Sequence, residues 1–153
     1  MRFKALIGCA LVIAGCTKKD AAPVDSAAAD TTAAAEPTTS LASFAAVWDV
    51  TAKKEGTDSV ATTYILNTTD TTDWTFAFPG GKPIHMKVTG IKGDTVLTLT
   101  DVFDSDARKG LKVQTNGASW IQDGKMVGKI TAHYQVTTPD SVRVYDTEGT
   151  RKY

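Results

Sequence analysis

Apolar and polar residues alternate along most of the chain after residue 45, which is the period-two pattern of strands with one buried face. Residues 48–53 alternate cleanly, and residues 74–78 place three aromatic side chains on one face. Residues 84–89 place three apolar side chains on one face, with His85 and Lys87 on the other. Helical periodicity is nearly absent, so this region predicts an all-β structure.

Turn residues interrupt the alternation at short intervals. We expect eight strands, at residues 48–53, 60–66, 74–78, 84–89, 95–100, 111–122, 125–138 and 141–146.

Asn116-Gly117 and Asp123-Gly124 are both hairpin signals. The first would split the sixth segment into short strands at 111–115 and 118–122. We favour one long strand with Gly117 as a bulge or bend, because the strand after Gly124 is long and requires a long partner.

The strands are joined by short links, and no connection is long enough for a βαβ crossover, so the sheet is antiparallel. Closing such a meander removes its exposed edges. We therefore predict an eight-stranded, up-and-down barrel over residues 43–153, with a two-sheet β-sandwich as the alternative. The longest interruption in this domain is residues 101–110, which carries Asp101, Asp104 and Asp106.

The chain begins with a basic segment followed by an apolar one. Two positive charges precede the uncharged run 5–15, which is shorter than the roughly 20 apolar residues that span a bilayer. The segment 13–16, Ile-Ala-Gly-Cys, resembles a bacterial lipobox. That resemblance implies a lipoprotein signal peptide at residues 1–15 and a lipid on Cys16. Cys9, the other cysteine, would be removed, so the mature chain would form no internal disulfide.

Residues 16–42 are rich in alanine, threonine and proline and contain no aromatic residue. Such a segment cannot bury enough apolar surface to offset the entropy of ordering it, so it predicts a disordered tether. Similarity to sorted lipoproteins implies a location in the cell envelope. With Thr17 after the cysteine, it implies the outer membrane, facing the periplasm or the cell surface, if the host has two membranes.

Charge and motifs exclude several kinds of site. The 17 basic and 17 acidic residues balance, which argues against a nucleic-acid partner. His85 and His133 lack the spacing of a zinc site, and the aspartates of 101–110 lack the pattern of a calcium loop. No nucleophile elbow or glycine-rich phosphate loop is present. We therefore expect no metal, no cofactor and no enzymatic activity.

A set of large apolar side chains alternates on the expected inner face. They would either fill a packed core or line a cavity for one small apolar ligand. These candidate ligand-binding residues are Tyr64, Trp74, Phe76, Phe78, Met86 and Tyr134.

Trp48 on the first strand, eight meandering strands and a late arginine resemble a lipocalin-type barrel. The resemblance implies that the tryptophan packs beside Arg143 or Arg151 at a closed end of the barrel. The chain departs from the family in having Ala46 where the G-x-W motif has glycine, and no long helix follows the last strand. It is also similar to small, uncharacterised bacterial lipoproteins whose last strands carry D-S-V and E-G-T-R, here residues 140–142 and 148–151.

Together these features predict a lipid-anchored envelope protein that binds a small apolar ligand or an envelope partner. A structural envelope protein without a ligand is the alternative. A hydrolase would require two or more of His85, His133 and the aspartates of 101–106 within hydrogen-bonding reach of one another.

Overall fold

A computed structural model describes residues 40–71 and 73–153. One short 3-10 helix, η1 (Leu41–Phe44), precedes the strands. The strands are β1 (Val47–Lys54), β2 (Val60–Asn67), β3 (Asp73–Ala77), β4 (Ile84–Lys92), β5 (Thr95–Thr100), β6 (Phe103–Asp104), β7 (Lys112–Gln122), β8 (Lys125–Tyr134) and β9 (Val142–Arg151).

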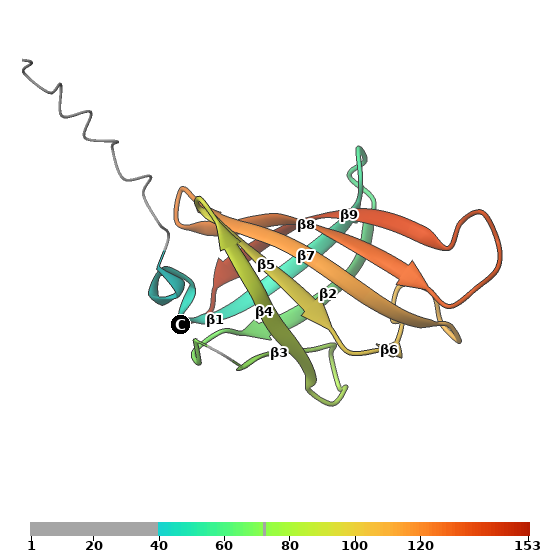
Figure 1. Ribbon diagram of the computed structural model, residues 1–153, viewed down its shortest axis with the longest axis horizontal. Coiled ribbons are helices and arrows are strands. Elements are labelled where there is room, and N and C mark those ends of the chain that lie inside the picture. The colour runs from blue at the N-terminus through green and yellow to red at the C-terminus, as the bar shows by residue number, and fades with distance from the viewer. Residues whose placement is uncertain (1–39, 72) are drawn as a thin grey trace, which may run out of the picture. The chain divides into compact units, whose positions relative to one another are not determined.

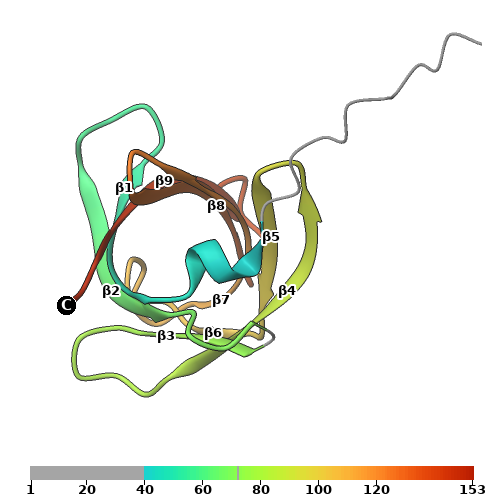
Figure 2. The same cartoon turned by 90° about the vertical axis from the view of Figure 1, so that its left-hand side faces the viewer.

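The strands form one antiparallel sheet that closes on itself (Figures 1 and 2). The hydrogen-bonded order is β5-β4-β3-β2-β1-β9-β8-β7-β6, and β5 also pairs with β7. That additional pairing joins Val96–Leu99 to Asn116–Ser119 and completes a barrel of eight long strands. The predicted meandering barrel is therefore confirmed, in a form consistent with a lipocalin-like barrel. The two-residue strand β6 pairs only with the start of β7 among the described strands.

Alternation along the strands decides which side chains enter the barrel. In β1, Trp48, Val50 and Ala52 are buried while Asp49 is exposed. The same rule places most of the other large apolar side chains inside, where they form a main core cluster and a smaller one of Val113, Ala132 and Tyr134; Phe103 and Tyr145 pack against both. Burial of this apolar face is the main driving force for closing the sheet.

Two predicted details differ from the structure. Gly117 does not mark a bulge, because the registers of β7 with β5 and β8 run past it without a shift. Glycine is needed there for another reason: a Cβ atom at this position would collide with the Thr98 hydroxyl of β5. The bulges lie instead in β1, between Ala52 and Lys53, and in β4, between Val88 and Gly90.

The last two strands also have different lengths from those expected. β8 ends at Tyr134 rather than at residue 138, and β9 continues to Arg151 rather than ending at residue 146. The extension has a clear cause, since β9 lies between β1 and β8 and can pair on both of its sides.

One end of the barrel is closed by η1, which lies across the opening in Figure 2. Trp48 is fully buried there, and its Nε1–H donates to the carbonyl oxygen of Phe44 at 2.9 Å. The Arg151 guanidinium lies over the Trp48 ring, 5.0 Å from its centroid, and donates to the carbonyl oxygen of Ser43 at 2.9 Å. Of the two arginines that the lipocalin resemblance offered, Arg151 is the one beside the tryptophan.

The expected signal peptide, the lipidated Cys16 and most of the tether lie outside the described residues. The first described element, η1, begins at Leu41, two residues before the expected start of the domain. Its Leu41 and Phe44 pack on the barrel core. Within the described ranges, no helix has the length and apolar character needed to span a membrane.

Candidate functional site

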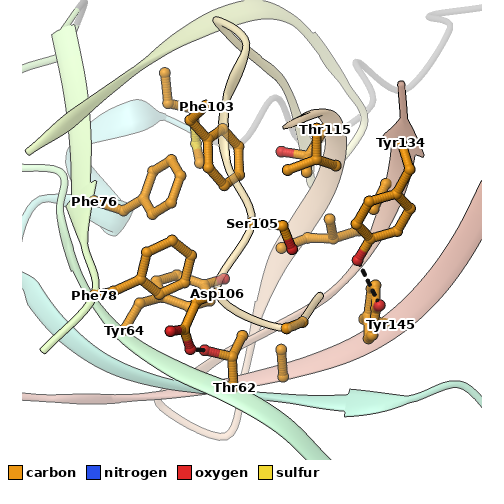
Figure 3. A pocket seen from close by; sticks show the side chains of 16 residues that line it. Thr62, Tyr64, Phe76, Phe78, Phe103, Ser105, Asp106, Thr115, Tyr134 and Tyr145 are labelled. Carbon is orange, nitrogen blue, oxygen red and sulfur yellow. Dashed lines mark hydrogen bonds between the residues drawn. The ribbon is translucent and has the colours of Figure 1, made fainter. Parts of the chain in front are cut away.

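A cavity of about 60 Å³ lies inside the barrel, toward the end opposite η1. Strands β1 to β4 and β6 to β9 all contribute side chains to it, and its surface is almost entirely apolar. Figure 3 shows six aromatic side chains around this space, Tyr64, Phe76, Phe78, Phe103, Tyr134 and Tyr145. We call it the outer cavity.

Four of these rings form one wall by edge-to-face packing. The Phe76 ring is central: its centroid lies 5.5 Å from that of Tyr64, 5.6 Å from Phe78 and 5.2 Å from Phe103. Aromatic pairs prefer this tilted geometry because the positive edge of one ring meets the negative face of another. The sequence produces the wall by placing Phe76 and Phe78 two residues apart, so that both point into the barrel.

A second, smaller space of about 10 Å³ lies deeper in the barrel, and we call it the inner chamber. Tyr64, Met86, Thr115 and Ile130 line both spaces, so the two adjoin. Trp74 lines the inner chamber only, and its ring packs against Phe44 of η1 with centroids 5.7 Å apart. The barrel interior therefore has an aromatic outer part and a narrower inner part.

The structure brings together most of the residues predicted to bind a ligand. Five of them line the outer cavity: Tyr64, Phe76, Phe78, Met86 and Tyr134. Trp74 shares their face but lies in the inner chamber, because alternation along a strand determines the side of the sheet and not the depth within the barrel.

Sequence analysis did not single out several other contributors to the outer cavity, among them Tyr145, Phe103 and the segment 105–107. Tyr145 lies within an expected strand, but Val142 and Val144 alternate onto the opposite face, so the period-two pattern did not point Tyr145 inward. Phe103 and the segment 105–107 were placed in a loop without periodicity. Nothing in their sequence indicated that they return to the barrel.

Residues 105–108 run beside the cavity and form what we call the mouth segment. The Asp106 carboxylate accepts a hydrogen bond from the Thr62 hydroxyl at 2.7 Å, as Figure 3 shows. The Ser105 hydroxyl accepts from the Arg108 backbone N–H at 3.0 Å, which closes a tight turn. A side-chain hydrogen bond, rather than a regular strand ladder, thus joins this segment to β2.

Arg108 ties the mouth segment to the other side of the opening. Its guanidinium donates to the carbonyl oxygen of Asp140 at 2.9 Å and lies 3.0 Å from the carboxylate of the same residue. It also lies over the Tyr134 ring, 4.6 Å from the centroid. Hydrogen bonds from Thr138 and Arg143 lower the pKa of the Asp140 carboxyl, so it is ionised at neutral pH.

Three of the rings that line the outer cavity are tyrosines. The hydroxyls of Tyr134 and Tyr145 are hydrogen-bonded at 2.8 Å. Burial, together with this hydrogen bond, raises the pKa of Tyr145. Burial alone raises the pKa of Tyr64, and no hydrogen bond joins the Tyr64 hydroxyl to another residue of the described ranges. Both residues are therefore neutral donors at physiological pH.

The histidines lie away from this cavity and from each other. His85 on β4 contacts the Asp73 carboxylate at 3.1 Å, and its side chain is exposed. His133 on β8 lies 3.4 Å from the Asn116 side chain of β7. Neither contact involves an aspartate of the 101–106 loop.

Two of the three aspartates in residues 101–106 have partners of their own. Asp104 pairs with Lys112 at 3.2 Å, and Asp106 reaches both Thr62 and Lys109. No group of three or more potential metal ligands occurs within residues 40–71 and 73–153.

No protein-family model matches the chain, and no curated protein or solved structure is significantly similar to it. The proposed function therefore rests on the amino-terminal sequence, the barrel and its cavity.

Proposed function

We propose that this protein is a lipid-anchored binding protein of the cell envelope that holds a small apolar molecule inside its barrel. The outer cavity carries the proposal: six aromatic rings from separate elements converge on one apolar space. Binding sites for small molecules are typically concave and apolar, with a few placed polar groups. Here Tyr64 and the Tyr134–Tyr145 pair provide those groups.

The volume of the cavity limits the size of the ligand. Drug-sized sites occupy about 300–1,000 Å³, and an engineered cavity of about 150 Å³ binds benzene. The outer cavity, at about 60 Å³, is smaller than either. A ligand the size of one aromatic ring therefore requires the cavity to enlarge. The mouth segment is the part of the cavity wall that polar side-chain contacts hold in place.

The proposed anchor is a lipid on Cys16, followed by a tether that separates the barrel from the membrane. One acyl chain binds a membrane weakly, whereas several give stable attachment. Mass spectrometry of the mature amino terminus tests this part separately. A triacylated or diacylated Cys16 supports it, and an intact, unmodified amino terminus rejects it.

Ligand binding is tested with purified full-length protein and a graded set of small apolar compounds. Bound ligand raises the melting temperature, because it stabilises the folded state alone. Native mass spectrometry of protein extracted under mild conditions then identifies any molecule carried from the cell. The proposal predicts stabilisation by small aromatic compounds and fails if none of them binds.

Opening of the mouth segment is tested with Asp106→Asn and Thr62→Val. Both weaken the hydrogen bond that joins this segment to β2. We expect faster association and dissociation of a bound aromatic compound in both variants. Lys92→Ala, in an exposed position at the end of β4, serves as the control. Equal rates in all three proteins would show that the ligand enters elsewhere.

A structural envelope protein without a ligand is the alternative, and the small volume of the cavity favours it. Crosslinking in intact cells, followed by identification of neighbouring proteins, tests that function. We propose no catalytic step, since His85 and His133 each have a separate neighbour and neither lines the cavity.

A further inference from the structure

Two polar side chains that line the inner chamber make no hydrogen bond to another described residue, and one of them, Trp74, has its polar atom fully buried. Trp74 is 1% exposed, and its Nε1 is the buried side-chain atom without a partner in the described part of the chain. Tyr64 is 8% exposed, and burial alone accounts for its raised pKa. An unpaired buried donor costs about 1–3 kcal/mol, so the Trp74 indole N–H needs an explanation.

Hydroxyl side chains surround the same chamber. Thr98, Thr115 and Thr147 are buried, and Ser119 completes the set. They come from β5, β7 and β9, whereas Tyr64 and Trp74 come from β2 and β3. Donors and acceptors from five strands thus meet around a space whose other walls are apolar.

The dimensions of the chamber suit one oxygen atom. Its volume of about 10 Å³ is close to the minimum that holds a single water-sized group. Because the chamber adjoins the outer cavity at Tyr64 and Thr115, one molecule can occupy both spaces. An apolar body would then lie among the aromatic rings, with a polar atom at its inner end.

The charge of that polar atom is also constrained. Every residue that lines the inner chamber is uncharged. A buried anion without a paired cation is strongly disfavoured, whereas a neutral oxygen needs only hydrogen bonds. The chamber therefore favours a hydroxyl or carbonyl oxygen over a carboxylate.

We propose that the inner chamber is a binding subsite for one neutral oxygen atom, in which the Trp74 indole N–H and the Tyr64 hydroxyl hold a small apolar alcohol, phenol, aldehyde or ketone. This inference rests on the proposed function and narrows it. It selects ligands that combine an apolar body with one uncharged oxygen over pure hydrocarbons and over carboxylates.

Toluene, phenol and benzoate test the subsite with purified full-length protein at pH 7. Toluene and phenol have nearly the same shape, and only phenol has an oxygen; benzoate carries a charge. Trp74→Phe removes the indole N–H while keeping a ring beside Phe44. We expect the ratio of phenol to toluene affinity to fall about tenfold in this variant, which matches the loss of one buried hydrogen bond. Benzoate should bind at least about a hundredfold more weakly than phenol.

The chain offers a matched control in Trp120, a half-buried residue of β7 outside both spaces. Trp120→Phe should leave the affinity ratio unchanged. In the wild-type protein, the indole N–H resonance of Trp74 should shift on addition of phenol more than on addition of toluene, while that of Trp120 stays in place. Tyr64→Phe provides a second variant if Trp74→Phe does not fold.

The outcomes separate the two proposals. If phenol and toluene both bind, but neither variant changes their ratio and the Trp74 resonance does not respond, the subsite is rejected and the binding function stands. The same result is expected if the chamber holds only a water that no ligand displaces. If no compound binds, the proposed function itself fails.

Discussion

Phe76 is the residue on which the aromatic wall depends, and replacing it with alanine tests the wall directly. The side chain is 5% exposed, and its ring contacts those of Tyr64, Phe78 and Phe103 at centroid distances of 5.2–5.6 Å. Phe76→Ala removes these contacts and enlarges the cavity.

The expected cost follows from burial. Replacing a buried phenylalanine with alanine costs about 3–5 kcal/mol. Because this ring borders an existing cavity of about 60 Å³, part of its surface already lacks a packing partner, and we expect a value near the lower limit, about 3 kcal/mol. A domain of this size is stable by about 5–15 kcal/mol, so the variant should still fold.

Urea denaturation measures the free energy of unfolding, provided that the slope with denaturant is unchanged. Ile65→Ala is the control, since Ile65 on β2 is 41% exposed on the outer face, and its loss should cost less than about 1 kcal/mol. Benzene at a hundredfold excess over its dissociation constant would restore about 2.7 kcal/mol to Phe76→Ala, while stabilising the wild-type protein much less.

A cost below about 1 kcal/mol for Phe76→Ala would refute this reasoning, because it would mean that the ring is not packed between its three neighbours. A cost of the expected size without any rescue by benzene would show that the enlarged cavity collapses. The aromatic wall would then be structural and would not define a binding site.

Three further changes test the fold and its electrostatics. Gly128→Ala should destabilise the protein by about 1–3 kcal/mol, because the new Cβ atom would collide with the backbone of β7. Gly90→Ala is the control: its Cβ atom would meet nothing within 4 Å, so the free energy of unfolding should change by less than about 1 kcal/mol. Urea denaturation of both variants measures the difference. Burial raises the pKa of Tyr64 in the folded state, so its contribution to stability is complete below about pH 10 and is lost as pH rises further. Tyr64→Phe should therefore reduce the fall of the urea midpoint with pH above about pH 10. If the midpoint falls as steeply in this variant as in the wild-type protein, the pKa of Tyr64 is not the cause of that fall. Arg151→Met should cost about 0.5–1 kcal/mol and alter the fluorescence of the first-strand tryptophan, while Arg143→Met should leave that emission unchanged.

The hairpin at residues 123–124 shows how much local sequence can determine. Asp123 and Gly124 both have positive φ, 51° and 76°, as the favoured two-residue turn requires. The turn sets Gln122 opposite Lys125, and the whole β7–β8 register follows from it. Local chemistry was a reliable guide here because the interacting residues are neighbours in the chain.

Gly117 shows the opposite case. The same dipeptide signal occurs at Asn116-Gly117, yet the strand continues through it. The need for glycine comes from Thr98 on β5, which approaches only once the barrel is closed. A contact between strands that are not joined by one turn leaves no local signature in the sequence.

The amino-acid sequence alone determined that the domain is all-β, where its main turns lie and which face of regularly alternating strands such as β1 and β3 is buried, because alternation and turn chemistry act over a few residues. Only the tertiary structure decided how deep each inward side chain lies: Phe76 borders the outer cavity, while Trp74, two residues earlier on the same face, reaches the inner chamber. It also decided that Arg151 meets Trp48 and that residues 105–107 return to the mouth. These arrangements depend on how the barrel closes and how its strands tilt. Closure brings together residues up to about a hundred positions apart, and both closure and tilt follow from the packing of the whole barrel.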